Sequence, residues 1–370
     1  RIPYGINAII AVIGVMLTLR VAETQKRKAQ LDLLGIVLTF VAIAAVILAG
    51  MLGSTYGWWD ARRPFELGGV ALNPLDLSPV VPLYAVAMIF ASLAVGHVGR
   101  VEERGGSPLF SLRLLDSRAF SATTVVVILF YLLVGALPFI VPIFLQDGVS
   151  FDAGQTGLVM TAFMLGSILG GLASRRVVTL IQPRLLLQIA MAIAAGGMLW
   201  MVTVSSLSMT PLVALLPMGV VGLGFGIVTT QVSNVLISPL PPDLQGSGSG
   251  FAEMSKEMGV GLGTALIGSI MFTVALGGMV DKVAVAAGEQ VTAEERAELI
   301  VQIEDEWVPE AVERIVAERV PNLEELTRTA YVEAFQVTLG VLIAMVLLAL
   351  FIASFIPRIR RDAMVQAVGH

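Results

Sequence analysis

The chain has 370 residues, of which 56% are hydrophobic and only 14% charged; its formal net charge is −5 and its mean hydropathy +0.87. Soluble domains carry about 25% charged residues, so this composition excludes an ordinary soluble protein and indicates one that crosses a membrane repeatedly. The absence of cysteine, with His97 and His370 as the only histidines, argues against disulfides, metal sites and histidine-based catalysis. We therefore expect no enzyme activity, no cofactor, no metal and no nucleic-acid partner.

Nine apolar segments follow along the chain, and each can cross a bilayer core as a helix of about 20 residues. Their approximate bounds are 3–20, 33–53, 80–98, 119–145, 154–174, 184–204, 211–237, 247–276 and 332–356. They lack the strict alternation of membrane-barrel strands, which predicts an all-α polytopic bundle in the lipid bilayer. Arg1 stands directly before an apolar run, so we interpret the chain as a fragment whose beginning is missing.

Basic residues in the short loops predict the side of the membrane on which each loop lies. If the loop after the first segment is cytoplasmic, the cytoplasmic side collects most of the arginines and lysines. These basic residues lie within 20–28, 100–104, 113–118, 175–184 and 358–361. The short loops 146–153 and 205–210 on the other side contain neither lysine nor arginine. This pattern predicts a multi-pass protein of the cytoplasmic membrane with a cytoplasmic C-terminus.

The segment 277–331 between the last two predicted spans has a different composition. It contains thirteen acidic residues against five basic ones. Thr292 and Glu295 have the spacing of a helix-capping box, and Leu299, Ile303 and Trp307 recur at helical spacing. We predict two short amphipathic helices on the outside of the membrane, with a solvated acidic linker as the alternative.

Four stretches in order along the chain resemble a known family. They are RIPYGIN at 1–7, DLLG at 32–35, SPLFSLRLLD at 107–116 and PIFLQ at 142–146. Their sequence and spacing are similar to those of the fourteen-span drug:proton antiporters of the major facilitator superfamily. This resemblance implies that residues 1–20 are the last helix of an N-terminal bundle. It also implies that 33–98 are two linker transmembrane helices, and that 119–358 are a C-terminal six-helix bundle.

Within that family the chain most resembles pumps for quaternary ammonium compounds. Some of those pumps carry a long outside hairpin before the last span, as 277–331 is predicted to do. They also carry two acidic residues four positions apart in the penultimate span, which here are Glu253 and Glu257. The resemblance implies proton-coupled efflux of organic cations, with protons, a cationic or lipophilic substrate and the missing N-terminal half of the transporter as partners.

The two acids have a physical reason to act together. At i and i+4 they share one helix face, about 6 Å apart along the axis. A carboxyl group withdrawn from water holds a proton more readily and can release it when a cation arrives. Lys256, three residues after Glu253, offers the alternative that an ion pair neutralises one of the acids. Glu257 is therefore the better candidate for the coupling residue.

Other polar and aromatic residues in the spans are weaker candidates for a substrate pocket. Gln231 and Asn234 lie near the end of one span, where they can equally serve helix contacts. Phe163, Trp200 and Met201 offer ring and sulfur contacts to a cation, with packing or a lipid-facing position as the alternative.

A cytoplasmic loop motif is similar to the one between the second and third helices of a bundle in this superfamily. Its residues are Gly170, Arg175, Arg176 and Arg184. The family pattern commonly has an acid where Ser174 stands, so a charge latch is not expected here. The alternative is that the arginines only anchor the loop on the cytoplasmic side.

The function that these features predict is proton-coupled efflux of organic cations. Two alternatives stay open: a transporter of another substrate class, such as a lipid or sugar precursor, and a non-transporting membrane scaffold. Fold resemblance alone does not separate the substrate classes. Two acids within a span favour transport, because a scaffold has no need of costly ionisable groups there.

Overall fold

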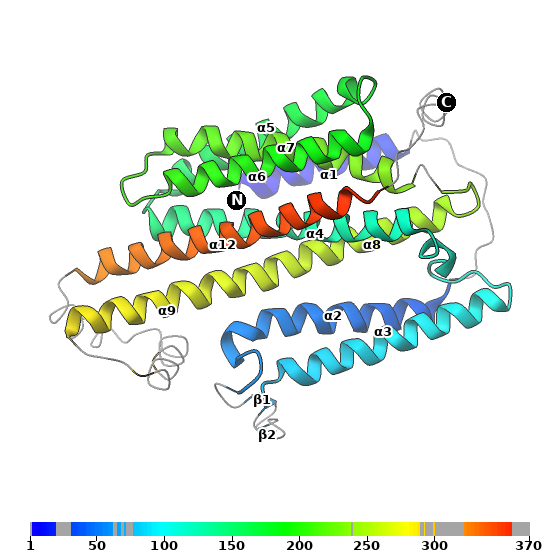
Figure 1. Ribbon diagram of the computed structural model, residues 1–370, viewed down its shortest axis with the longest axis horizontal. Helices are drawn as coiled ribbons and strands as arrows, with labels where there is room; N and C mark the ends of the chain where they lie inside the picture. Colours follow the sequence, from blue (N-terminus) through cyan, green and yellow to red (C-terminus); the bar gives the residue numbers. More distant parts are fainter. Residues whose placement is uncertain are drawn as a thin grey trace. The chain divides into compact units, whose positions relative to one another are not determined.

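The computed structural model describes residues 2–19, 31–61, 65–67, 70–71, 77–237, 240–288, 292, 299 and 322–356. It divides into two units, residues 1–31 and 32–370. The first unit contains helix α1 (Ile2–Thr18), and the second contains all the other described elements (Figure 1).

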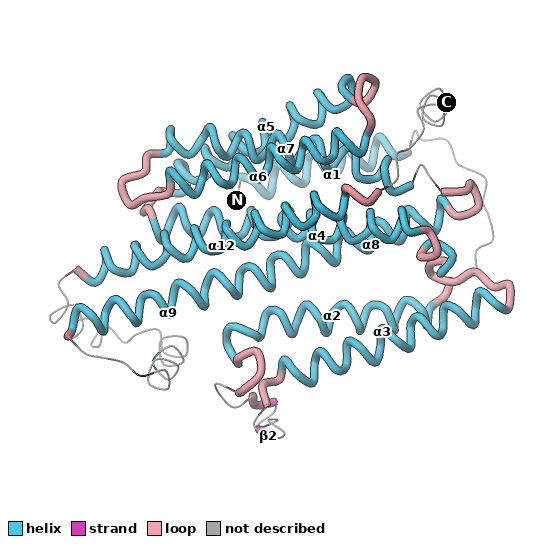
Figure 2. The backbone as a smooth tube through the Cα atoms, in the orientation of Figure 1, coloured by secondary structure: helices cyan, strands magenta, loops and turns pink. Residues whose placement is uncertain are grey.

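The second unit is a bundle of long helices (Figure 2). The helices are α2 (Leu33–Tyr56), α3 (Val80–Glu103), α4 (Arg118–Ile143), α5 (Ala153–Val177), α6 (Pro183–Val204), α7 (Pro211–Ile237), α8 (Gln245–Leu262), α9 (Gly268–Ala287) and α12 (Leu323–Ala353). A 3₁₀ turn, η2 (Leu112–Leu114), precedes α4, and π-helical turns follow α4 and α8 at η3 (Phe144–Gly148) and η4 (Gly263–Ile267). Two-residue antiparallel strands, β1 (Glu66–Leu67) and β2 (Val70–Ala71), lie between α2 and α3.

All nine predicted apolar segments overlap helices of the structure. Eight described helical stretches are long and apolar enough to cross a membrane, and α1 has a shorter apolar stretch at Asn7–Thr18. The prediction of a helical, multi-pass membrane protein is therefore confirmed.

The eighth predicted segment is longer in the structure than its hydropathy indicated. Helices α8 and α9 join through η4 into one apolar stretch, Gln245–Ala286, of 42 residues. At 1.5 Å per residue this stretch is about 60 Å long, roughly twice the hydrocarbon thickness of a bilayer. Helix α12 begins at Leu323, and Lys282 of α9 pairs with Glu333 of α12 at 2.8 Å. The predicted outside segment 277–331 is thus helical at both ends, while its two amphipathic helices fall outside the described residues.

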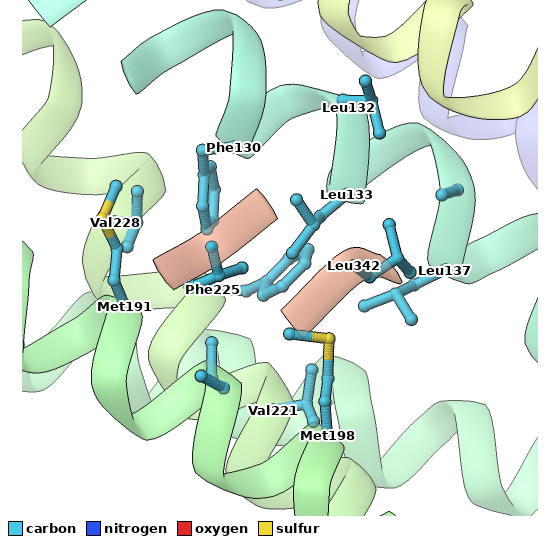
Figure 3. Close-up of a cluster of buried hydrophobic side chains, with 14 of the residues drawn as sticks. Phe130, Leu132, Leu133, Leu137, Met191, Met198, Val221, Phe225, Val228 and Leu342 are labelled. Atoms are coloured by element: carbon cyan, nitrogen blue, oxygen red, sulfur yellow. The ribbon is translucent and has the colours of Figure 1, made fainter. Parts of the chain in front are cut away.

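The core of the bundle forms around α4 and α7. Both helices have 56% of their apolar window buried, against 17% for α3. Figure 3 shows the centre of this core, where Phe130 and Leu133 of α4 approach Phe225 of α7. At the far end of α4, the rings of Phe144 and Phe335 stack at 3.8 Å. Helices α4 and α7 therefore contribute a far larger share of their length to the core than α3 does.

Glycine brings α5 and α7 into backbone contact. A Cβ atom added at Gly226 would lie 1.8 Å from the carbonyl oxygen of Ser167, and one at Gly170 would lie 2.1 Å from that of Leu223. No side chain larger than hydrogen fits at these positions without moving a helix. Glycines spaced four apart, Gly166 with Gly170 and Gly222 with Gly226, therefore let these two helices approach closely.

Helix α2 starts at a carboxylate that also holds its neighbours. Asp32 Oδ1 accepts from the backbone N–H of Gly35 at 2.9 Å and lies 2.7 Å from Nε2 of His97 on α3. Asp32 Oδ2 accepts from the backbone N–H of Leu109 at 3.2 Å. Burial of this carboxyl group opposes its ionisation, but these hydrogen bonds and the charge of His97 outweigh burial and hold the pKa of Asp32 below its ordinary value.

The segment after α3 connects the α2–α3 hairpin to the start of α8. The carboxylate of Glu102 accepts from the hydroxyl of Ser111 and, at 3.0 Å, from the backbone N–H of Leu112. The backbone N–H of Ser111 donates to Oγ of Ser247 at 2.7 Å. Short-range polar contacts thus fix the end of α8 that precedes its two acids.

Candidate cation and proton site

Two faces of α8 have different surroundings. On one face, a Cβ at Gly259 would lie 2.8 Å from the carbonyl oxygen of Ile128 on α4, and one at Gly263 of η4 would lie 1.9 Å from that of Leu132. On the other face, Glu253 and Glu257 are exposed in the described chain. The glycine face seats the helix against α4, and the register of 3.6 residues per turn then leaves both carboxylates outside this contact.

Lys256 forms the ion pair that the sequence offered as an alternative. Its Nζ atom lies 3.0 Å from Oε2 of Glu253. The same Nζ donates to Oγ of Ser233 on α7 at 3.1 Å and lies 5.7 Å from the ring centroid of Tyr131 on α4. The lysine side chain is 14% exposed, against 65% for that of Glu253. The ammonium group is therefore held between three helices, while its carboxylate partner remains accessible.

Glu257 differs from Glu253 in its partners. No described side chain forms an ion pair with Glu257, although it directly follows Lys256 and lies one turn from Glu253. The helix thus carries one compensated acid and one uncompensated acid on the same face. An uncompensated carboxylate in a membrane span is costly unless it takes up a proton or a cation.

Aromatic rings extend from this cluster into the core. The ring of Tyr131 lies 5.9 Å from that of Phe130, which lies 4.9 Å from Phe225 of α7, and Phe225 lies 5.3 Å from Phe163 of α5. Phe163 is thus linked to the site through a row of rings. Sequence reasoning missed Tyr131 and Phe225, because nothing in the local sequence indicates that α4 and α7 meet at the level of Lys256.

The two polar candidates on α7 separate in the structure. Gln231 is 2% exposed in the core, and its Oε1 has no hydrogen-bond partner. Asn234 is exposed near the end of α7. Between them, Ser233 is the residue of this helix that reaches the ion pair.

The two candidates on α6 also occupy different environments. Met201 is 1% exposed and belongs to the hydrophobic core, whereas Trp200 is 42% exposed. Neither has a hydrogen bond or an ion pair to Glu253 or Lys256. The burial of Met201 in the core agrees with a packing role for this side chain.

The loop motif contains a neutral contact where the family commonly has a charge. Ser174 is buried at the end of α5, and its hydroxyl lies 2.6 Å from Oγ1 of Thr230 on α7. Gly170, one turn earlier, packs on the α7 backbone. Arg175 and Arg176 are exposed. A hydrogen bond between hydroxyl groups therefore joins these two helices at this end.

Arg184 has a different role from the other two arginines of the motif. From the first turn of α6, its guanidinium donates to the carbonyl oxygen of Ile356 at 2.5 Å and to that of Ser354. Both acceptors follow the end of α12, where helix carbonyls lack partners within the helix. The side chain thus caps one helix from the start of another.

The arrangement on α8 combines two carboxylates with one ammonium group on one face of the helix. Among the residues that the structure describes, no three His, Cys, Asp or Glu side chains gather where they could hold a metal ion. Two carboxylates with one ammonium group leave one net negative charge on this face. One negative charge can be balanced by a single proton or a single monovalent cation.

Comparison with known proteins places the chain in a family. The model of the Major Facilitator Superfamily matches residues 1–264. The chain is 27% identical over 371 residues to a probable actinorhodin transporter of Streptomyces coelicolor, covering 85% of this chain and 62% of that protein. It is 25% identical over 366 residues to the tetracenomycin C resistance and export protein of Streptomyces glaucescens, covering 98% and 62%.

A more distant relative is the multidrug transporter protein MdtP of Bacillus subtilis, which is 23% identical over 272 residues, covering 72% of this chain and 46% of that protein. The chain spans less than two thirds of the length of these relatives. The family match covers well over half of the chain and agrees with its bundle of apolar helices. The chain belongs to the major facilitator superfamily.

Proposed function

We propose that this chain is part of a drug exporter that drives organic cations across the membrane by proton exchange. The observation that carries the proposal is the pair of unequal acids on the open face of α8. The names of the relatives, which include a probable actinorhodin transporter, a tetracenomycin C export protein and a multidrug transporter, support drug export.

Glu257 is the coupling residue in this proposal, because no described side chain neutralises it. A protonated Glu257 leaves the face electrically neutral, with Glu253 balanced by Lys256. When an organic cation approaches, the proton leaves Glu257 and the carboxylate takes the cation as its counterion. Proton and cation then compete for one negative charge, which is the requirement for exchange.

Transport also needs a second bundle. Alternating access arises when two bundles rock about a site that lies between them. We assign 119–358 to the C-terminal bundle, 33–98 to the two linker helices and 1–20 to the last helix of the N-terminal bundle. The remaining N-terminal helices of the transporter are the partner that would close over the face of Glu253 and Glu257.

The distribution of charge supports an orientation in the membrane. The start of α2 and the start of α8 both contact the segment that follows α3, and Arg113 of that segment pairs with Asp243 in the loop before α8. The carbonyl oxygen of Ile356, after the end of α12, accepts a hydrogen bond from Arg184. We propose that this end is cytoplasmic, as is the C-terminus. The chain has no cysteine, so Ser208→Cys should react with an impermeant thiol reagent in intact cells, and Asp243→Cys should not. Labelling of Asp243→Cys alone would contradict the proposed orientation and indicate the opposite one.

The coupling role is tested by ethidium efflux against pH in cells that express the transporter. Glu257→Gln keeps the size of the side chain but removes its charge, so proton-linked efflux should be abolished. Glu253→Gln should weaken efflux of some cations only. The control is Glu103→Gln, an exposed acid at the end of α3, which should behave as the wild type. Wild-type efflux by Glu257→Gln at matched expression would refute the proposal.

A further inference from the structure

A groove lies between α2 and α8 beside the two acids. Its volume is about 250 Å³, and most of its wall is apolar. The apolar residues that matter here are Ile36, Phe40, Ile43, Phe110, Phe251 and Met254. Drug-sized ligands usually occupy about 300–1,000 Å³, so this groove suits one part of such a ligand rather than the whole.

The wall of the groove is built from packed aromatic rings. Phe110 and Phe251 meet edge to face at 5.1 Å, and Phe251 also lies 5.7 Å from Phe120 of α4. Phe110 belongs to the segment that Asp32 and Ser247 hold in place through its neighbours. The groove is therefore a preformed surface on which a flat ring or an alkyl chain can pack.

One polar atom in the wall lacks a partner. Thr39 of α2 lines the groove, and its Oγ1 is buried with no hydrogen-bond partner. Threonine hydroxyls in helices often bond to a carbonyl of the preceding turn, but this one does not. The hydroxyl is thus an unpaired polar atom behind an otherwise apolar wall.

The groove and the acids are neighbours on α8. Gly250 and Met254 line the groove, and Glu253 and Glu257 follow them at i+3. Residues at this spacing have Cβ atoms about 5–6 Å apart on the helix surface. A molecule in the groove is therefore within one side-chain length of the uncompensated carboxylate of Glu257.

We propose that the groove binds the apolar part of an amphiphilic organic cation whose charged end lies at Glu253 and Glu257. The inference rests on the proposed function, because it uses the same two acids. Charge complementarity selects this occupant over a phospholipid, since a phosphate beside an unpaired carboxylate would be repelled. The α2–α8 groove then sets which cations are accepted, by the shape of their apolar part.

The chain offers a matched pair of variants for a test. A Cβ at Gly250 or at Gly246 would meet no atom within 4 Å, and both positions are exposed on α8. Only Gly250 lines the groove. Gly250→Leu therefore adds a side chain to the wall of the groove at a position where its Cβ has room, and Gly246→Leu makes the same change one turn away.

The probe is tetraphenylphosphonium, with its affinity for the purified protein measured in detergent. Gly250→Leu should weaken binding by about tenfold, the factor expected when one large apolar group loses its contact. Gly246→Leu should bind as the wild type, and Glu257→Gln should lose binding. As a second measurement, Phe40→Cys in this cysteine-free chain should be alkylated more slowly when the probe is bound.

Several results would overturn the inference. Unchanged affinity in Gly250→Leu together with lost binding in Glu257→Gln would refute cation binding in the groove and leave the proposed function intact. Unchanged affinity in both variants, or no binding by the wild type, would refute the groove inference and the proposed function together. An equal loss in Gly246→Leu would show that the effect does not come from the groove. Loss of a co-purified phospholipid from Gly250→Leu, with unchanged probe affinity, would make the groove a lipid site.

Discussion

Helices α7 and α8 are both rich in glycine, but they use it differently. On α7, Gly222 and Gly226 are buried against the backbone of α5, and no charged residue occurs between Pro211 and Ile237. On α8, Gly259 packs against α4, whereas Gly246 and Gly250 face open space beside three ionisable residues. The comparison separates a closed seam that holds the bundle together from an open face that is available to a ligand.

The difference follows from what each face must satisfy. A seam of backbone against backbone gains van der Waals contact along its whole length and leaves no room for water. A face with two carboxylates and one ammonium group needs water, a counterion or another protein surface beside it. Substitutions on α7 should therefore change stability, and substitutions on the open face of α8 should change binding.

The largest effect is expected in the seam. In Gly226→Leu the new Cβ would lie 1.8 Å from the carbonyl oxygen of Ser167, so α5 and α7 must separate. We expect a loss of about 3 kcal/mol or more in the free energy of unfolding, seen as loss of monodisperse protein on heating in detergent. Gly196→Leu, where nothing lies within 4 Å, is the matched control. Equal thermal stability of the two variants would contradict the role of the seam.

A smaller effect is expected at Arg184, which joins two other helices. Arg184→Gln removes a charged donor from the carbonyl oxygens of Ser354 and Ile356. We expect a loss of about 1–3 kcal/mol, measured by thermal unfolding in detergent. Arg176→Gln changes an exposed arginine of the same loop and should leave the unfolding temperature unchanged. A drop of the same size in both variants would mean that the loop charge, and not the cap, is stabilising.

On the open face, Lys256→Met should change binding more than stability. The ammonium group opposes an incoming cation, so its removal should tighten binding of tetraphenylphosphonium, by about fivefold at most for a partly exposed ion pair. Lys282→Met removes a lysine that pairs with Glu333 outside this face and is the control. Weaker binding by Lys256→Met would show that the lysine supports the site rather than opposing the cation.

The smallest effect is expected at Asp32, which joins the start of α2 to α3 and to the segment that follows α3. Its pKa lies below the ordinary value, so ionised Asp32 stabilises the fold above about pH 4, and this contribution is lost as pH falls through the lowered pKa. Asp32→Asn keeps a helix-capping oxygen but loses the charge beside His97. We expect a loss of about 1 kcal/mol at neutral pH.

The pH dependence of unfolding provides the check on that prediction. The difference between wild type and Asp32→Asn should shrink as the pH falls below 4, because the wild-type carboxyl then becomes neutral as well. Thermal unfolding in detergent between pH 3 and pH 7 measures this difference. A constant difference over that range would mean that the charge of Asp32 does not contribute.

Some of these features were predictable from the sequence and others were not. Hydropathy predicted nine segments that all overlap helices, and the spacing of Glu253 and Glu257 predicted their common face. It ended the eighth segment too early, because Asp281 and Lys282 lower the hydropathy of a helix that continues to Ala287. Local composition predicts which segments enter a membrane, but it does not predict the residue at which a helix ends.

The sequence by itself determined the membrane-spanning helices and the spacing of the two acids, because these depend on residues within a few turns of one another. Only the tertiary structure decided that Lys256 lies between Ser233 and Tyr131, and that Glu257 has no described ion-pair partner. It also decided that α2 and α8 leave a groove beside the acids. These features depend on how separate helices pack, and helix packing is set by side-chain shape across segments far apart in the chain.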